Sequence, residues 1–153
     1  MPVKNSLAEM QPEISEWRHD FHRYPELRFD LPRTTARVVA LLTEFGVDDI
    51  IEGVGTSGVV AVIKGRSTAS GKVIGFRADM DALPITELAQ HDYVSTESGK
   101  MHACGHDGHT SILLGAAKYL SETRNFDGTV VLAFQPAEEG GGGARAMVSD
   151  GLM

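Results

Sequence analysis

The chain has 153 residues, of which 42% are hydrophobic and 23% are charged. That length and composition predict a single globular domain with one hydrophobic core. It carries 21 Asp and Glu residues against 14 Lys and Arg residues, a formal net charge of −7. An acidic balance without a cluster of basic residues argues against the phosphate-binding surface of a nucleic-acid-binding protein, so we expect no nucleic-acid partner.

The sequence carries no sign of secretion or of membrane insertion. Residues 1–6 hold no apolar signal-peptide core, and no stretch approaches the roughly 18 consecutive apolar residues of a membrane span. The one cysteine, Cys104, cannot form an internal disulfide and is compatible with a reducing compartment. We therefore expect a cytoplasmic protein with no membrane partner.

Two helices are predicted at the start of the chain. Apolar residues recur every three or four positions over residues 7–21, which indicates an amphipathic helix, and Pro25 fits its end. A second helix is predicted to begin near Pro32, because proline is favoured in the first turn, and to run to Gly46.

Two strands are predicted next. Residues 58–63 are rich in β-branched side chains and bounded by glycine, and residues 72–78 show the same character. The turn-forming residues 67–71 between them predict that the two strands form a hairpin. Residues 86–101 are polar and irregular, which indicates a surface loop.

The last third of the chain alternates helices with a buried strand. A helix is predicted over residues 112–120, after Gly108, and a short one over residues 144–148. Residues 128–134 form a near-continuous apolar run, the pattern of a strand buried on both faces. This alternation predicts an α/β layered fold.

Side chains that can do chemistry follow two predicted strands and precede one helix. They are Asp79 and Asp81, Glu138 and Glu139, and Cys104 and His106. In open α/β sheets, binding sites lie beyond the carboxyl ends of the strands. Three separate segments are therefore predicted to meet at one site.

Residues 101–110 hold three histidines, one cysteine and one aspartate. Thiolate, imidazole and carboxylate groups are the usual protein ligands of transition metals, so this cluster indicates a metal site. A polar loop that merely starts a helix, a buried inert thiol, and Cys104 acting as a nucleophile are the alternatives. Cysteine hydrolases usually take their base from a distant segment, so the closeness of Cys104 to His106 favours joint coordination.

Two pairs of carboxylates complete the predicted site. Glu138 and Glu139 follow an apolar strand, and neighbours there point in different directions, so one can bind metal while the other acts as a general base. Asp79 and Asp81 end the strand before it, and either could orient a ligating histidine. A solvated acidic turn and helix capping are the structural alternatives for these two pairs.

Four stretches in this order resemble the M20 metallopeptidase family, specifically its amidohydrolase branch, which includes hippurate hydrolase and N-acyl-amino-acid amidohydrolases. They are residues 22–27, 77–85, 101–110 and 134–147. The resemblance implies a three-layer α/β/α sandwich, similar to the catalytic domain of zinc aminopeptidases. It also implies two divalent metal ions per complete site. Zinc or manganese is expected, although cobalt and nickel also suit such mixed ligands.

The resemblance assigns roles to five residues. Cys104, His106 and Glu139 look like metal ligands, and Glu138 looks like the general base that activates the attacking water. Asp81 matches the acid that supports the metal ligands without binding the metal itself. The implied reaction is hydrolysis of the amide bond of an N-acyl amino acid or a similar small molecule. His109 lies in the motif, but the resemblance gives it no ligand role.

Members of the family are much longer than this chain. They carry an inserted lid and dimerisation domain, and two further histidine ligands downstream. Residues 1–153 are thus expected to be the N-terminal part of the metal-dependent catalytic domain, incomplete at its C-terminus and weakly active or inactive alone. Two alternatives remain. One is a non-catalytic module that binds metal or a partner, where an open sheet edge would favour a homo-oligomer; the other is a metal-free cysteine hydrolase.

Overall fold

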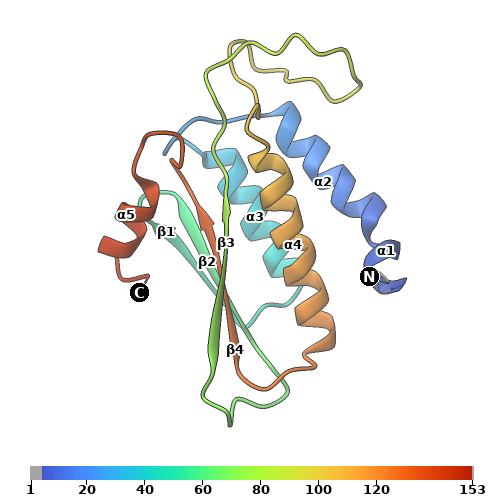
Figure 1. Ribbon diagram of the computed structural model, residues 1–153, viewed down its shortest axis with the longest axis vertical. Coiled ribbons are helices and arrows are strands. Elements are labelled where there is room, and N and C mark those ends of the chain that lie inside the picture. Colours follow the sequence, from blue (N-terminus) through green and yellow to red (C-terminus); the bar gives the residue numbers. More distant parts are fainter. Residues whose placement is uncertain (1–4, 153) are drawn as a thin grey trace.

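The computed structural model describes residues 5–152 as a mixed sheet with helices on both faces (Figure 1). The helices are α1 (Asn5–Glu9), α2 (Gln11–Arg23), α3 (Pro32–Glu44), α4 (His106–Thr123) and α5 (Gly143–Ser149). The strands are β1 (Asp49–Val54), β2 (Gly58–Lys64), β3 (Val73–Asp79) and β4 (Thr129–Gln135). The predicted α/β/α sandwich is confirmed, with α2, α3 and α4 on one face and α5 on the other.

The strand order is β1-β2-β4-β3. β2 pairs antiparallel with both β1 and β4, whereas β3 pairs parallel with β4. The predicted hairpin of residues 58–63 with residues 72–78 is therefore wrong, because β4 lies between these strands. The physical reason is burial: β4 is apolar along most of its length and takes a central place, as its predicted burial on both faces requires. The parallel β3–β4 pair is joined through α4.

β1 was not predicted from the sequence. It is an edge strand whose residues are exposed or only half-buried, and Asp49, Glu52 and Gly53 interrupt any apolar alternation. It forms the hairpin with β2. Residues 86–101 contain no helix or extended strand, in agreement with the predicted loop.

The first predicted helix is in fact two. α1 ends at Glu9 and α2 begins at Gln11, with Pro12 in the first turn of α2. Proline lacks an N–H and collides with the preceding turn, so a helix cannot run through it undisturbed. The second predicted helix is confirmed as α3, which begins at Pro32.

The start of α3 is stabilised by a side chain of the preceding segment. The carboxylate of Glu26 accepts hydrogen bonds from the backbone N–H groups of Arg33 (3.1 Å) and Thr34 (2.8 Å). It thereby satisfies donors that the first turn of a helix leaves unpaired. The backbone carbonyl of Glu26 also accepts the N–H of Ala82 (2.8 Å), so this segment lies against the end of β3.

Hydrophobic residues are buried on both faces of the sheet. On the helix-covered face, alternate residues of β2 join the main core. On the opposite face, Val60 and Ala133 pack against Met147 of α5. The edge strand β3 leaves apolar side chains exposed on both faces of the sheet: Val73, Ile74 and Phe76. No helix among residues 5–152 is long and apolar enough to cross a membrane.

Candidate metal centre

The three segments predicted to form a site meet at the carboxyl ends of β3 and β4. α4 begins at His106, earlier than predicted, so His106 is the first helical residue and Cys104 lies in the turn before it. Gly105 between them has φ 90°, a left-handed conformation that favours glycine. Ligand atoms of Cys104, His106 and Glu139 all lie within 4.8 Å of one another.

Asp81 connects the two halves of this site. Its backbone carbonyl accepts a hydrogen bond from Nδ1 of His106 at 2.7 Å. Its buried carboxylate accepts the backbone N–H groups of Glu138 (2.9 Å) and Glu139 (3.1 Å). The first contact leaves Nε2 of His106 free to face the site, and the second fixes the turn that carries the two glutamates. Asp81 therefore positions both kinds of group.

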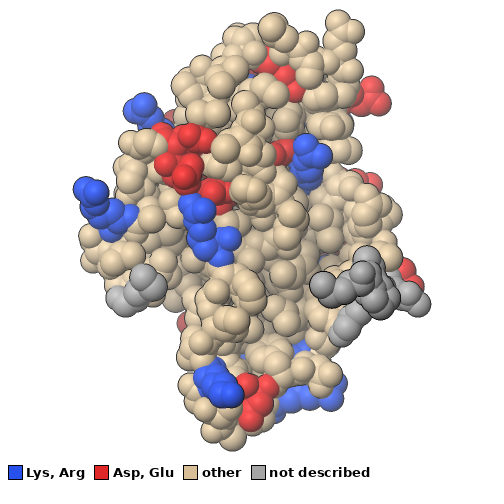
Figure 2. All heavy atoms as spheres, in the orientation of Figure 1, with Lys and Arg blue, Asp and Glu red and all other residues tan. Residues whose placement is uncertain are grey.

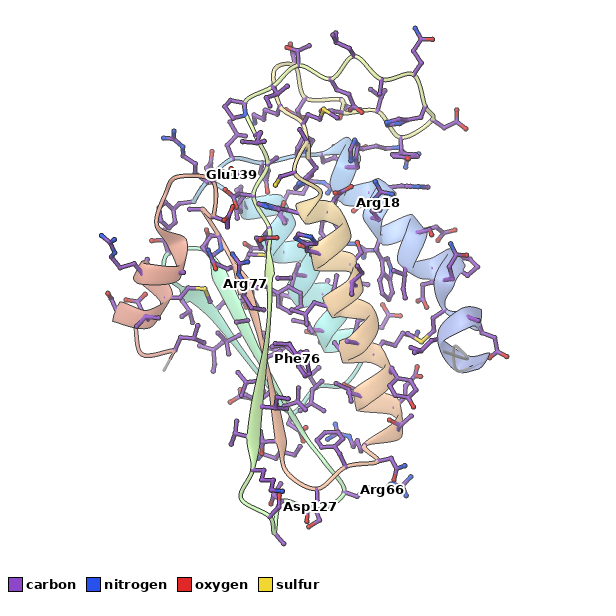
Figure 3. All side chains as sticks on the ribbon, in the orientation of Figure 1. Arg18, Arg66, Phe76, Arg77, Asp127 and Glu139 are labelled. Atoms are coloured by element: carbon purple, nitrogen blue, oxygen red, sulfur yellow. The ribbon has the colours of Figure 1, made fainter. Side chains whose placement is uncertain are left out.

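The two glutamates lie in a tight turn after β4. Nε2 of His106 is 3.7 Å from Oε2 of Glu138 and 3.8 Å from Oε1 of Glu139. The side chain of Glu138 is 40% exposed and that of Glu139 is 25% exposed. The turn has no space to spare, because a Cβ on Gly143 would overlap the carbonyl oxygen of Pro136. Figure 2 shows acidic side chains gathered on the surface where Figure 3 labels Glu139.

A further pair of side chains lies on the β3 side of His106. Oδ1 of Asp79 is 2.7 Å from Nδ1 of His109, and its Oδ2 is 2.9 Å from the guanidinium of Arg77. Arg77 also donates to the side chain of Gln135 at 2.8 Å, which ties β3 to β4 below Glu139 (Figure 3). Asp79, His106 and His109 form a second group whose ligand atoms lie within 4.8 Å. The sequence placed His109 in the motif but did not predict this pairing.

The carboxylates set the protonation of their neighbours. Burial lowers the pKa of His106, but the contacts with Asp81 and Asp79 outweigh burial and raise that pKa. Burial raises the pKa of Asp81, yet the hydrogen bonds from His106, Glu138 and Glu139 lower it overall. A hydrogen bond to Glu139, followed by burial, raises the pKa of the exposed Cys104 thiol.

The sequence suggested that the side chains of residues 101–110 form one cluster. In the structure they divide into two groups. Cys104 and His106 face the glutamates, whereas His102 and Asp107 lie on the other side of the first turn of α4, near His22. Oδ2 of Asp107 is 2.8 Å from Nδ1 of His22. Both ring nitrogens of buried His102 lack a hydrogen-bond partner within residues 5–152. Burial lowers the pKa of His102 to about 4, although the charge of Asp107 opposes this.

The donor set beside the glutamates fits a divalent transition metal. A thiolate, an imidazole nitrogen and a carboxylate oxygen are ligands that zinc prefers, and three protein ligands with an open position are typical of catalytic zinc sites. The hydrogen bond from Nδ1 of His106 to a backbone carbonyl is the usual support for a ligating histidine. Cys104, His106 and Glu139 are therefore the residues that would hold an ion.

The chain matches the family described as Peptidase family M20/M25/M40 over residues 75–153. It is 51% identical over 146 residues to a hippurate hydrolase of Campylobacter jejuni, covering 95% of this chain and 37% of that protein. It is 41% identical over 153 residues to an N-acyl-L-amino acid amidohydrolase of Geobacillus stearothermophilus, covering 99% of this chain and 40% of that protein.

A solved structure agrees with these relatives. A Bacillus subtilis protein described as a dinuclear metal binding peptidase from the M20 family superposes with a TM-score of 0.88 at 40% sequence identity. The superposition covers 95% of this chain and 40% of that protein. The chain thus spans about two fifths of the length of the relatives that it matches.

Proposed function

Since the chain belongs to the peptidase family M20/M25/M40, we propose that its site takes part in metal-dependent hydrolysis of the amide bond of N-acyl amino acids. The observation that supports this most directly is the double role of Asp81. It holds the imidazole of His106 through its backbone and the Glu138–Glu139 turn through its carboxylate. A ligand set and a free carboxylate are thereby brought to one place.

The two glutamates have different roles. Glu139 shares a group of mutually close ligand atoms with Cys104 and His106, so it is the metal ligand. Glu138 lies outside that group and is the more exposed carboxylate, so it is free to exchange protons. A divalent ion bound beside it would supply positive charge that polarises the substrate carbonyl. Glu138 takes a proton from the attacking water and returns it to the leaving nitrogen.

His106 can bind only one metal ion at a time. Both groups of close ligand atoms, the one with Cys104 and the one with Asp79, include His106. Its Nδ1 donates to the carbonyl of Asp81, so only Nε2 has a lone pair for a metal. A site for two ions, zinc or manganese, therefore draws its remaining ligands from beyond these two groups.

We expect residues 1–153 alone to hydrolyse amides weakly or not at all. Cys104 is exposed and Glu138 is 40% exposed, so water reaches the site freely. Electrostatic stabilisation of a developing charge is much weaker in such a wet site than in a closed one. The chain also spans about two fifths of the length of its relatives.

The decisive experiment separates the chemistry of these residues from the length of the chain. The purified chain and a chimera are assayed on N-acyl amino acids, with metal content measured in parallel. In the chimera, these residues replace the matching 146-residue stretch of the Campylobacter jejuni hippurate hydrolase. We expect metal-dependent turnover by the chimera that chelators abolish, and little turnover by the chain alone. A folded, metal-loaded chimera without turnover would contradict the proposal.

The same experiment distinguishes the two alternatives. A non-catalytic metal-binding module would load metal and leave the chimera inactive. A metal-free cysteine hydrolase would keep its activity in the presence of chelators. The raised pKa of Cys104 argues against the second alternative, because carboxylates beside the thiol oppose formation of the nucleophilic thiolate.

A further inference from the structure

A second group of potential ligands lies outside the metal centre, where residues 86–101 cover the upper ends of α2 and α4 (Figure 1). Ligand atoms of His22, Glu87 and His91 all lie within 4.8 Å of one another. Oε1 of Glu87 is 3.1 Å from Nε2 of His22 and 2.9 Å from Nε2 of His91. We propose that this His22–Glu87–His91 cluster is a second binding site for a transition metal ion, with zinc the best match.

The distances suit a metal ion. A tetrahedral zinc site with bonds of about 2.0–2.2 Å holds its ligand atoms roughly 3.3–3.6 Å apart. The two separations from Glu87 are a few tenths of an ångström shorter, so small side-chain rotations make room for an ion. Two imidazoles and one carboxylate form a ligand set that proteins use for zinc.

The contact between Nδ1 of His22 and Asp107 leaves Nε2 of His22 facing Glu87. The carboxylate of Asp107 can only accept, so Nδ1 of His22 donates to it at 2.8 Å. In a neutral ring, the lone pair of Nε2 then faces a carboxylate oxygen of Glu87. Two acceptors at 3.1 Å repel each other unless a second proton or a metal ion lies between them. A carboxylate behind the ligating ring is the usual support for a metal-bound histidine.

The remaining groups are arranged for a ligand role rather than for a hydrogen-bonding one. The second oxygen of Glu87 accepts the backbone N–H of Ser95 at 2.7 Å, which fixes the direction of the first oxygen. His91 turns Nε2 to the same oxygen as His22, while its Nδ1 has no partner among the described residues. The negative charge of Asp107 is balanced by Arg18, whose Nε is 3.2 Å away on the face of α2 toward α4 (Figure 3).

An ion here would join two segments that are far apart in the sequence. His22 belongs to α2, whereas Glu87 and His91 belong to the segment over residues 86–101. The side chains of His22 and Glu87 are 5% and 2% exposed, so an ion would be well shielded, and His91 at 27% leaves a way in. The ion would hold this segment against α2.

The test measures zinc binding to the untagged chain after the first site has been removed. In a Cys104→Ser/His106→Gln background, which disrupts both ligand groups that contain His106, we expect one zinc ion per chain by equilibrium dialysis with elemental analysis. Adding His91→Gln, which can still donate to Glu87, should weaken binding more than about 100-fold. Adding Asp107→Asn should weaken binding roughly 10- to 100-fold, the usual effect of removing a supporting carboxylate.

His19→Gln is the matched control. His19 also lies on α2 and stacks on Tyr93 with ring centroids 3.8 Å apart, but it is not part of the cluster. Its substitution should leave zinc binding unchanged. Circular dichroism confirms that each variant is folded.

Hydrogen exchange gives a second measurement that does not need the double variant. Zinc should slow exchange of the amides of Ser95 and Thr96 in the unaltered chain and in His19→Gln, but not in His91→Gln. If zinc binds the double variant no better than it binds the triple variant that adds His91→Gln, the proposal is wrong. The same holds if zinc leaves the exchange of these amides unchanged. The cluster then holds a proton, as a buried imidazolium between two carboxylates.

Discussion

His106 and Asp107 are neighbours in the sequence, yet their side chains serve opposite sides of the first turn of α4. His106 faces the Glu138–Glu139 turn, in a site that is open to water. Asp107 is buried and faces His22, in a cluster closed over by residues 86–101. Successive residues of an α-helix point about 100° apart, so a single short motif can supply two differently solvated sites. The open side suits turnover, and the closed side suits structural support.

The largest expected effect is on the open side. In the chimera, Glu138→Gln should lower the rate of amide hydrolysis by roughly 10²- to 10⁴-fold, because the amide cannot accept the proton of the attacking water. Metal content should stay the same, since Glu138 lies outside the ligand group. Steady-state kinetics with elemental analysis checks both expectations, and a variant that keeps its rate would remove Glu138 from the mechanism.

The next effect belongs to the closed side and depends on pH. The pKa of His102 is about 4 in the folded chain, against about 6.5 in the unfolded chain. Between these values the unfolded state binds a proton that the folded state does not, so stability falls as the pH falls from 6.5 to 4. The loss amounts to roughly 3 kcal/mol over that window, at 1.36 kcal/mol per pH unit.

Urea unfolding at several pH values between 4 and 7 measures this dependence. The variant His102→Leu has no group to protonate there, so its free energy of unfolding should change less with pH across the same window. An unchanged slope in the variant would show that the acid sensitivity comes from another group.

The smallest expected effect tests how Asp81 links His106 to the Glu138–Glu139 turn. Asp81→Asn turns one acceptor into an amide donor that faces a backbone N–H of the Glu138–Glu139 turn. We expect a loss of about 1–3 kcal/mol in stability, the cost of leaving a buried donor unpaired. We also expect zinc affinity at Cys104, His106 and Glu139 to fall roughly 10- to 100-fold.

Asp48→Asn is the control for that substitution. Asp48 also accepts a backbone N–H, from Lys64 at 2.8 Å, and an arginine, but it lies on the surface far from the site. Its loss should cost under about 1 kcal/mol, as for other exposed ion pairs, and should not alter zinc binding. Equal effects of the two substitutions on zinc affinity would show that Asp81 does not position the ligands.

Local sequence patterns predicted much of the fold. The errors of that prediction have specific physical causes. The β4 strand was predictable because a long apolar run needs cover on both faces. Its position between β2 and β3 was not, because strand order depends on which strands pair over long distances. β1 was missed because its exposed residues carry no alternation, and the first helix was divided by Pro12.

The place of the site was predictable from where its segments lie relative to the predicted strands and helix. Cys104 and His106 precede a helix and Glu139 follows a strand, so these residues could be expected at one edge of the sheet, and their ligand atoms do meet. The way in which Asp81 positions its neighbours could not be predicted, because it uses the backbone carbonyl of Asp81 as well as the carboxylate. Glu87 lies in the segment predicted as a surface loop, and the burial of its side chain depends on contacts with His22 and Ser95 that no local pattern reveals.

The parallel register of β3 on β4 also has a consequence for the order of folding. Asp79 pairs with Gln135, and only this alignment brings Asp81 to the amides of Glu138 and Glu139, 57 and 58 residues away. A shift by one residue would turn the side chains that follow each strand to the other face. Contacts between residues so far apart in the chain form late, because closing the loop between them costs entropy first. Capture of a metal ion by Cys104, His106 and Glu139 would thus mark the completion of the sheet, and its kinetics would time that step.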